Sequence, residues 1–535
     1  MSPALFDKSK DMTMSPLFLS ASALIVLAYV IKAILSRPQK LDLPIVGKPG
    51  ADYWQEALLE GTAKVRIFPS AIRLLGSHDP PMVVLPHCTH EEVRNLTEEK
   101  VSFQKELHRM FLTPHTKLAK DLPVVVKTVK SDLTRHSPST VSALEDETTY
   151  ALETEFGTDE SWNKVALFEK VVRIVALVSG RVFVGRPLSR NEEWIQASTQ
   201  YTVDSAKARD AAVEWPVWAR YFVLPFLPDI KKVKTHTAKA ADLLKPVINQ
   251  YLQRAREGKG IRGESSNGVD DAQGTFVGWI MKHTSPELRE DPYTLAINQL
   301  SLSFASIHTT TMALCHILFD LASHPEFIAP LREEIERVIA EDGFEVDSSG
   351  KKSLKKQSMV KLKKLDSLMK ESQRLSPVAI LTNTRITTSS LHLSTGHTIP
   401  KGTRIGYDAQ VLNMAGPDLS LLSQDPSTMP QLDPPSVFSP FRFASIRETP
   451  GNESKYQFVT TSKEAMNFGH GNHACPGRFF AGIEMKIILI EFLRGWDFRN
   501  VGDTEMKGGG RPENFGFDIS ISPNPVAEIE IKRRV

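Results

Sequence analysis

Cysteine, excess charge and nucleotide-binding motifs are all scarce in this sequence. Only three of the 535 residues are cysteines, at positions 88, 315 and 475, too few and too scattered for a disulfide framework. The 65 basic and 63 acidic side chains leave a net charge of +2, which gives no reason to expect a nucleic-acid partner. Gly508–Gly510 follows no strand–helix pattern suited to a phosphate, and no flavin or nicotinamide segment is evident. We therefore expect a reducing compartment and no flavin or nicotinamide domain.

An apolar run, residues 16–35, lies near the N-terminus. Its length of about twenty residues is enough to cross a bilayer core, and its one charge, Lys32, is close to its end. A secretory signal peptide is the alternative, but the run is long and no clear small-residue cleavage site follows it. Arg37 and Lys40 follow instead, and basic residues directly after a span favour a cytosolic location for the rest of the chain.

This pattern predicts a single-pass signal anchor in the endoplasmic reticulum membrane, with the body of the protein in the cytosol. Residues 1–37 would form the tail and the transmembrane anchor, residues 38–50 a proline-containing hinge, and residues 51–535 the main domain. Hydrophobic residues make up 41% of the chain, which suits a sizeable core. Most of residues 50–340 has a helical pattern, with short strand-like runs at 64–75, 81–85 and 385–406. We predict a mainly α-helical fold with small β-sheets.

The most informative segment is the loop at 468–478, Phe-Gly-His-Gly-Asn-His-Ala-Cys-Pro-Gly-Arg. Cys475 precedes an apolar helical segment, about residues 479–492, so a thiolate there would lie near the positive end of the helix dipole. The glycines let the backbone approach a flat ligand, Phe468 can screen the sulfur from water, and His473 can donate to an anionic group. This combination suits a cysteine that ligates heme iron.

Two other interpretations of this loop stay open. A lone cysteine before a helix is most often a small buried hydrophobe. His470, His473 and Cys475 could instead bind zinc, although tetrahedral sites usually draw on a second Cys or His pair with recognisable spacing. Neither Cys88 nor Cys315 has such a neighbour.

A second feature is one long apolar segment from Asp291 to His324, well above the mean helix length. Its centre, residues 303–311, reads Ser-Phe-Ala-Ser-Ile-His-Thr-Thr-Thr and is unusually polar for a buried helix. The hydroxyls can simply bond back to the preceding turn. Alternatively they line a groove for dioxygen and ordered water and pass protons.

A third feature is the pair Glu371 and Arg374, which share a helix face and can form an ion pair. By itself this spacing is a weak signal, because it recurs at Glu91/Arg94, Glu334/Arg337 and Glu491/Arg494. Context favours the pair Glu371/Arg374. A Leu-x-Pro ending follows it, and then Phe-Ser-Pro-Phe-Arg-Phe at 438–443, before the cysteine loop.

The segments, in this order, resemble the cytochrome P450 monooxygenases. The loop at 468–478 looks like the family's heme loop, Phe-Gly-x-Gly-x-His-x-Cys-Pro-Gly-Arg, in which the histidine at 473 is more often arginine. Residues 305–310 are similar to the oxygen-binding helix, Ala/Gly-Gly-x-Asp/Glu-Thr-Thr, but Ser306 replaces the glycine and His308 replaces the acid. Glu371, Arg374 and Arg442 match the family's Glu-x-x-Arg pair and its later Pro-x-Arg-Phe arginine, with Phe441 in place of the usual glutamate.

The resemblance implies a cytochrome P450 fold in which residues 51–535 are a heme-thiolate catalytic domain and Cys475 is the axial ligand of heme b. Thr309 would deliver protons, helped by His308 in the place of the acid. Glu371, Arg374 and Arg442 would be a structural triad. His115, Lys117 and Lys120 are guesses for a second propionate partner, with a solvated basic face as the simpler explanation. The other cofactor-binding residues would be Phe468, Gly469, Gly477, His473 and Arg385.

The resemblance also implies that one oxygen atom of O2 is inserted into a lipophilic small molecule. Electrons would come from NADPH through a separate membrane-bound cytochrome P450 reductase, with cytochrome b5 as a further donor. The motifs look most like fungal enzymes of secondary metabolism, many of which oxidise terpenoids. The alternatives are a heme-thiolate isomerase or dehydratase that needs no reductase, and a non-catalytic heme-binding sensor. Residues 214–230 cluster aromatics and prolines before Lys231 and Lys232, which suits either contact with a bilayer surface or a buried core segment.

Overall fold

The computed structural model describes residues 43–46, 72–74, 82–257, 274–346, 350, 352–417, 430–517 and 520–535. The predicted anchor at 1–37 and most of the predicted hinge at 38–50 lie outside these residues. Within them, one helix is long and apolar enough to cross a membrane by length and composition, and most of its apolar window is buried in the protein. This helix is α14 (Pro292–Ser323).

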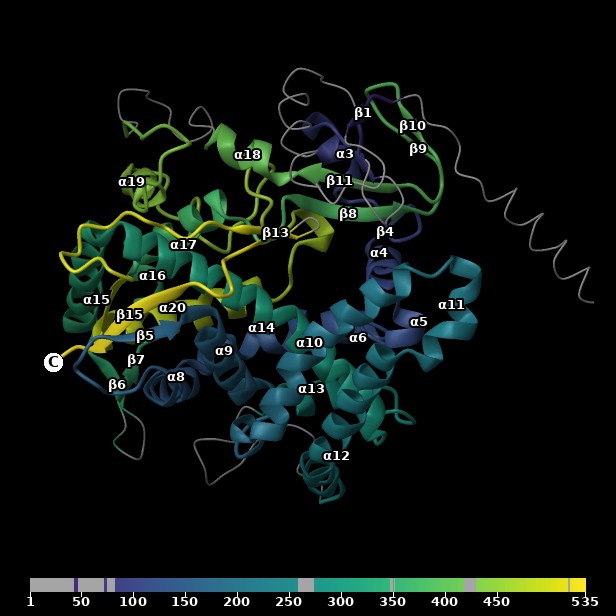
Figure 1. Cartoon of the computed structure of the whole chain (residues 1–535), viewed down its shortest axis with the longest axis horizontal. Helices are drawn as coiled ribbons and strands as arrows, with labels where there is room; N and C mark the ends of the chain where they lie inside the picture. The colour runs from purple at the N-terminus through teal and green to yellow at the C-terminus, as the bar shows by residue number, and fades with distance from the viewer. Residues whose placement is uncertain are drawn as a thin grey trace, which may run out of the picture.

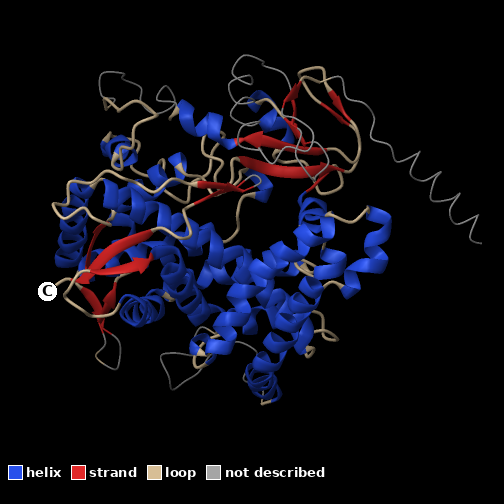
Figure 2. Cartoon of the chain, viewed as in Figure 1, coloured by secondary structure: helices blue, strands red, loops and turns tan. Residues whose placement is uncertain are grey.

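The described part of the chain is mainly α-helical, and its strands form small sheets, as predicted (Figure 2). Helices fill most of the molecule, while the largest sheet lies at one edge, at the upper right of Figure 1. The longer helices besides α14 are α8 (Val141–Phe156), α9 (Leu167–Phe183), α10 (Glu192–Val213), α12 (Pro228–Arg256), α15 (Ile328–Asp342), α17 (Lys363–Leu375) and α20 (Arg478–Gly495). The shorter ones include α3 (His90–Val93), α4 (Phe103–Met110), α5 (Thr113–Thr116), α6 (Leu122–Thr128), α7 (Thr134–His136), α11 (Val217–Val223), α13 (Phe276–His283), α16 (Ser358–Lys361), α18 (Ala409–Ala415) and α19 (Arg442–Glu448).

The central helix α14 begins and ends where the sequence predicts. The Asp291 carboxylate accepts hydrogen bonds from the backbone N–H groups of Tyr293 and Thr294, which otherwise have no partner inside the helix. Helices α9, α10, α12 and α17 all pack against α14. Because so many helices cover it, α14 is apolar around most of its circumference, as expected of a core helix.

The largest sheet brings together segments that are distant in the sequence. Its strand order is β1-β2-β3-β11-β8-β4. Strand β11 (Arg404–Asp408) pairs in parallel with β3 (Met82–Val84) and antiparallel with β8 (Leu381–Thr387). Since β8 follows α17 after a short connection, the sheet is joined directly to the helix that carries Glu371. The remaining strands of this sheet are β1 (Ile45–Val46), β2 (Ile72–Leu74) and β4 (Val101–Ser102).

The other strands form one three-stranded sheet and three hairpins. The sheet has the order β12-β15-β5, with β5 (Asn163–Ala166), β12 (Trp496–Asn500) and β15 (Glu528–Arg533). The hairpins are β6 (Phe344–Val346) with β7 (Lys352–Leu354), β9 (Leu391–His392) with β10 (Thr398–Ile399), and β13 (Phe515–Phe517) with β14 (Ser520–Ser522). The β13–β14 hairpin lies against the segment after α17, where the Ile521 N–H donates to the Val378 carbonyl over 3.3 Å.

Candidate functional site

The cysteine loop ends at the N-terminus of α20, so that helix amides point at the sulfur. Cys475 is partly buried, and its thiol is hydrogen-bonded by the backbone of Gly477 and Arg478. Burial raises the pKa of Cys475, while these N–H donors and the Arg478 charge act in the opposite direction. A partly buried sulfur with two N–H donors is therefore suited to carry negative charge once a metal cation bonds to it.

Two glycines give the loop a shape that other residues would not adopt. Gly469 and Gly471 have positive φ values of 66° and 79°. A Cβ on Gly471 would lie 2.8 Å from the Arg94 carbonyl oxygen, and one on Gly469 would lie 3.1 Å from Asn383 Oδ1. Gly477 differs, because its φ is −83° and a Cβ there would come no closer than 4.0 Å to a neighbour. The backbone conformation at position 477 therefore does not require glycine.

Residues that the sequence did not single out hold this loop in place. The Thr382 hydroxyl donates to the Met466 carbonyl over 2.8 Å, and Asn383 Oδ1 accepts from the His470 N–H over 3.3 Å. Asn383 also donates to His90, whose ring stacks on the ring of His470 with 5.6 Å between their centroids. These partners come from α3 and β8, and no local motif marks them, so only the fold reveals them.

On α14, two residues of the predicted oxygen-binding segment form an open face in a buried helix. Ala305 and Thr309 are exposed, although Ser303, Ile307 and Thr310 around them are buried. Because they are four residues apart, they lie on the same face of the helix. The Thr309 hydroxyl donates to the Ala305 carbonyl over 2.7 Å, which leaves its oxygen lone pairs free to accept. The Thr309 hydroxyl thus bonds back to the preceding turn and also lies on the open face, so the two interpretations of this segment do not exclude each other.

His308 lies on a different face of α14 and contacts α10. Its Nε2 lies 3.2 Å from the Thr199 carbonyl oxygen, and because a carbonyl only accepts, Nε2 carries the proton. Burial lowers the pKa of His308 below its ordinary value. The neutral ring is therefore favoured.

Arg385 and His473 lie on the same aromatic ring, that of Phe103. The Arg385 guanidinium carbon is 4.8 Å from the ring centroid, and the His473 ring centroid is 6.3 Å from it. Arg385 is buried and donates to the Thr384 carbonyl, and among the described residues no carboxylate hydrogen-bonds it. Burial lowers the pKa of Arg385 to about 10, opposed by the charges of Glu98 and Glu106. A buried guanidinium with unused donors is suited to bind a carboxylate ligand.

The three guessed propionate partners are not placed with Arg385 and His473. Lys117 and Lys120 are exposed, and Lys117 donates to the nearby Pro114 carbonyl. The pKa of His115 is lowered by burial and by the charges of Lys117, Lys234 and Arg220, which places it beside α11 and α12. For these residues the structure favours the solvated basic face.

Together these features fit heme b. The residues comprise a partly buried thiol with N–H donors directed at its sulfur, an open helix face with a small residue and a threonine, and a buried guanidinium with free donors. Zinc fits less well, because no group of three or more potential ligands is found among the described residues.

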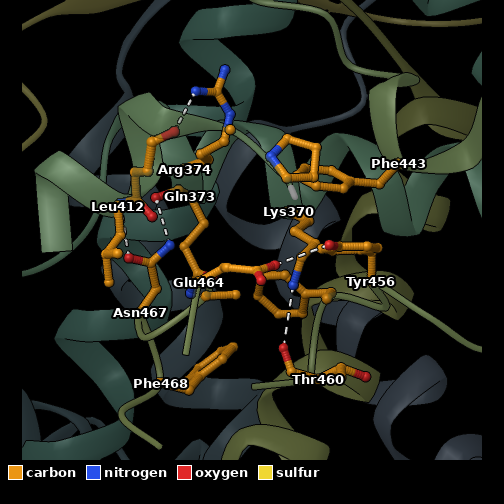
Figure 3. A pocket seen from close by; sticks show the side chains of 15 residues that line it. Lys370, Gln373, Arg374, Leu412, Phe443, Tyr456, Thr460, Glu464, Asn467 and Phe468 are labelled. Carbon is orange, nitrogen blue, oxygen red and sulfur yellow. Dashed lines mark hydrogen bonds between the residues drawn. The ribbon is translucent and has the colours of Figure 1, made fainter. Parts of the chain in front are cut away.

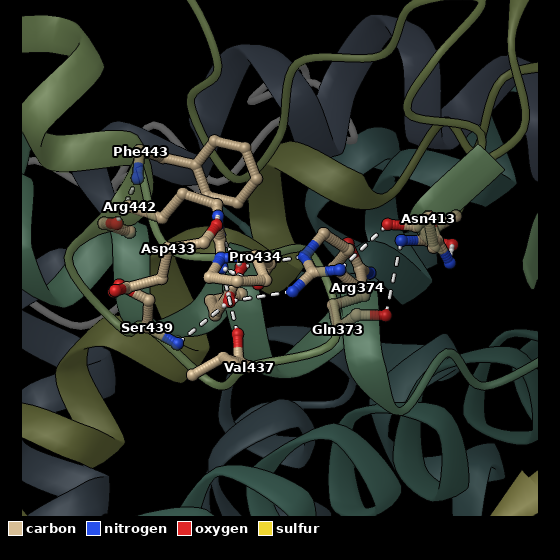
Figure 4. A network of polar contacts seen from close by, with 12 residues as sticks. Gln373, Arg374, Asn413, Asp433, Pro434, Val437, Ser439, Arg442 and Phe443 are labelled. Carbon is tan, nitrogen blue, oxygen red and sulfur yellow. Dashed lines mark hydrogen bonds and ion pairs between the residues drawn. The ribbon is translucent and has the colours of Figure 1, made fainter. Parts of the chain in front are cut away.

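The predicted structural triad forms a buried ion cluster (Figure 4). Arg374 donates to both carboxylate oxygens of Glu371 over 2.8 and 2.9 Å, and Arg442 Nε donates to the same carboxylate over 3.1 Å. All three side chains are buried. Arg442 also donates to the carbonyls of Asp433, Pro434 and Val437. The triad therefore holds residues 433–442 against α17.

The same cluster reaches the cysteine loop through two asparagines. Arg374 donates to the Asn413 carbonyl over 2.9 Å, and the Asn413 amide donates to the Asn467 side chain over 3.0 Å. Asn467 immediately precedes Phe468, so the position of the loop depends on the buried pair. The other Glu-x-x-Arg spacings behave differently: Glu91/Arg94 and Glu491/Arg494 are more exposed, and Arg337 pairs with Glu341.

Behind the loop is a small hollow whose lining includes Lys370, Tyr456, Thr460 and Phe468 (Figure 3). Lys370 donates to the carbonyls of residues 457 and 460 over 3.1 and 3.2 Å, and burial lowers its pKa to about 8. Arg478 donates to the Val459 carbonyl between them. Two cations thus hold the segment that packs Phe458 against Phe468, with 5.2 Å between ring centroids.

Comparison with known proteins gives the following similarities. The family model described as cytochrome P450 matches residues 109–513. Cytochrome P450 monooxygenase ascG of Acremonium egyptiacum is 45% identical over 538 residues, which cover 100% of this chain and 99% of that protein. Cytochrome P450 monooxygenase BOA7 of Botryotinia fuckeliana is 39% identical over 511 residues, covering 94% and 91%. A further relative, from Gibberella fujikuroi, is 35% identical over 514 residues, covering 95% and 93%.

Proposed function

Because the chain belongs to the cytochrome P450 family, whose members are heme-dependent monooxygenases, we propose that it is a membrane-bound enzyme that inserts one oxygen atom of O2 into a lipophilic small molecule. Its heme is held by Cys475, and its electrons come from NADPH through a separate reductase, with cytochrome b5 as a further donor. The observation that carries the proposal is the partly buried Cys475 thiol with two backbone donors at the start of α20.

The substrate that we propose is a terpenoid or a related secondary metabolite. His473 and the Ser-Ile-His-Thr-Thr-Thr segment resemble fungal enzymes of secondary metabolism, and the three relatives described above come from fungi. Next to the open face of α14, the rings of Phe304 and Phe111 pack edge-on with 4.7 Å between centroids. An aromatic surface beside Ala305 supports an apolar substrate.

Heme b, when bound, supplies the iron centre that activates dioxygen. Cys475 holds it through the sulfur, and the N–H groups of Gly477 and Arg478 stabilise the thiolate charge. Arg385 and His473 would bind its carboxylates. Thr309 delivers protons on the open face of α14, where its hydroxyl can turn from the Ala305 carbonyl toward the substrate side.

The decisive experiment is the spectrum of the reduced protein with carbon monoxide. The wild type is expected to show the red-shifted Soret band of thiolate ligation, and Cys475→Ser is expected to lose it. Cys88→Ser is the matched control, because Cys88 is exposed and far from the loop in sequence. A wild-type protein without this band would refute the proposal.

Two further measurements separate the alternatives. Product formation that requires NADPH and reductase distinguishes a monooxygenase from a heme-thiolate isomerase or dehydratase. A substrate-induced spin shift with candidate terpenoids distinguishes an enzyme from a heme-binding sensor, for which no such shift is expected.

An exposed aromatic surface supports a second contact with the membrane. Trp218, Tyr221, Phe222 and Phe226 on and after α11 are 61%, 78%, 69% and 74% exposed, so this segment is not the buried core segment that the sequence left open. Lys231, Lys232 and Lys234 at the start of α12 are exposed beside it. Aromatic rings flanked by cations suit the interfacial region of an anionic bilayer.

This contact is tested with protein that lacks residues 1–37. The truncated protein is expected to bind phosphatidylcholine vesicles more strongly when they contain phosphatidylserine, and Phe222→Ser is expected to weaken that binding. Val360→Ser, an exposed apolar residue on α16, is the control. Complete solubility of the truncated protein in the presence of vesicles would contradict a second contact.

A further inference from the structure

His308 and Thr309 are neighbours in the sequence but point to different parts of the molecule. Thr309 is on the open face of α14, whereas the His308 ring contacts the middle of α10. Successive residues of an α-helix are rotated by about 100° around its axis, so the His308 side chain, which faces α10, lies on a different face of α14 from Thr309. The His308 side chain therefore lies between the open face of α14 and helix α10.

The contact is a directed hydrogen bond between two helices. The His308 Nε2–H donates to the Thr199 carbonyl over 3.2 Å, while the Thr199 hydroxyl donates to the Ile195 carbonyl over 2.8 Å. The bond is half-buried, so water competes with it less than at the surface.

The rest of the interface gives α10 little other polar attachment. On α10, the hydroxyls of Tyr201, Thr202 and Ser205 are buried and have no hydrogen-bond partner among the described residues. On α14, the same holds for the Asn298 side-chain oxygen and for both polar atoms of the Gln299 side chain. Ion pairs attach α10 to its other neighbours, with Asp204 2.8 Å from His236 of α12 and Glu192 2.8 Å from Arg173 of α9, whereas the His308 bond attaches it to α14 beside Thr309.

We propose that His308 is a positioning residue: it ties α10 to α14 beside Thr309 and thereby sets the space available to a bulky ligand over the open face. His308 does not relay protons, because its one protonated nitrogen donates to the Thr199 carbonyl and its ring lies on a different face of α14 from Thr309. The inference rests on the proposed function, since it concerns the same open face of α14.

The first measurement is amide hydrogen exchange of peptides covering residues 195–205. His308→Phe keeps the ring shape without a donor and is expected to raise exchange by about fivefold, the loss of one hydrogen bond of about 1 kcal/mol. His308→Gln, which can reach and donate, is expected to restore protection. His308→Asn has a side chain too short to reach the Thr199 carbonyl. It is a second variant without this hydrogen bond, in case His308→Phe does not fold.

The second measurement separates positioning from a general loss of stability. Imidazole and 4-phenylimidazole are titrated spectroscopically into the heme-containing protein. His308→Phe is expected to change the affinity for 4-phenylimidazole severalfold, to leave that for imidazole unchanged, and to be corrected by His308→Gln. Thr309→Ala is expected to leave the exchange of residues 195–205 as in the wild type.

The outcomes are distinguishable from one another. Unchanged exchange of residues 195–205 in both His308→Phe and His308→Asn would overturn the proposal. So would equal loss of coupling between NADPH and product in His308→Phe and His308→Gln, which is the behaviour of a proton relay. If the proposed function is wrong, the wild type will lack the carbon monoxide signature. Hydrogen exchange would still report whether His308 attaches α10 to α14.

Discussion

Glu371 and Arg442 are 71 residues apart in the sequence, yet Arg442 Nε lies 3.1 Å from a Glu371 carboxylate oxygen. Their side chains are 0% and 1% exposed, so neither charge is solvated by bulk water. A buried pair of this kind adds little net stability compared with apolar packing, but the loss of one partner leaves an uncompensated charge.

We therefore expect Arg442→Ala to destabilise the protein by about 3–5 kcal/mol and to release the cysteine loop. Thermal unfolding and heme content after purification measure this. Arg494→Ala is the control, because its ion pairs with Glu336 over 2.8 Å and Glu491 over 3.7 Å are partly exposed, and its effect should stay within about 1 kcal/mol. Equal effects of the two substitutions would show that the buried triad has no special role.

The shape of the loop gives a second prediction. Gly471→Ala would place a Cβ 2.8 Å from the Arg94 carbonyl in a conformation with φ of 79°, so the loop must shift to accept it. We expect a large fall in heme content and in the carbon monoxide signature. Gly451→Ala is the control, since its φ is 85° but no atom lies within 4 Å of the added carbon. It should cost only about 1 kcal/mol of backbone strain. Full heme content in Gly471→Ala would contradict the geometry.

A third prediction concerns proton delivery by Thr309. Thr309→Ala removes the exposed hydroxyl of the open face, and we expect product formed per NADPH to fall by about tenfold or more while peroxide accumulates. Thr311→Val is the control, because the Thr311 hydroxyl is buried and only bonds back to the Ile307 carbonyl over 2.8 Å. If coupling efficiency in Thr309→Ala equals that of the wild type, Thr309 has no such role.

Three histidines predict a loss of stability in acid: His470 in the cysteine loop, His90 stacked on it, and His87, which precedes α3. Burial lowers the pKa of His87 to about 4, lowers that of His90 to about 4, and lowers that of His470 as well. Between pH 6.5 and about 4 the unfolded chain therefore binds more protons than the folded protein, so stability falls as pH decreases through this window.

His87→Phe removes one of these groups and should reduce the loss of stability in acid by up to about 3 kcal/mol, in melting curves recorded from pH 7 to 4. His392→Phe, at an exposed position, should leave the acid sensitivity unchanged. Identical pH profiles for the wild type and His87→Phe would exclude His87 as a cause.

The sequence alone determined the features that arise from local patterns. The central helix could be predicted between Asp291 and His324 because an apolar run ends at residues that satisfy or break the helical hydrogen bonds. The helix after Cys475 could be predicted from the apolar run at about residues 479–492, and it extends to Gly495. The pairing of Glu371 with Arg374 needed only their spacing within one helix.

Only the tertiary structure decided which distant groups meet. Thr199 as the partner of His308, Asn383 and His90 as supports of the loop, and the Phe103 ring under Arg385 come from segments with no local motif. Such pairings depend on how helices and strands pack against each other, because the free energy of a buried contact is set by neighbours far away in the sequence. A histidine in the place of an acid thus acquires its role from α10, the helix that the fold packs beside it.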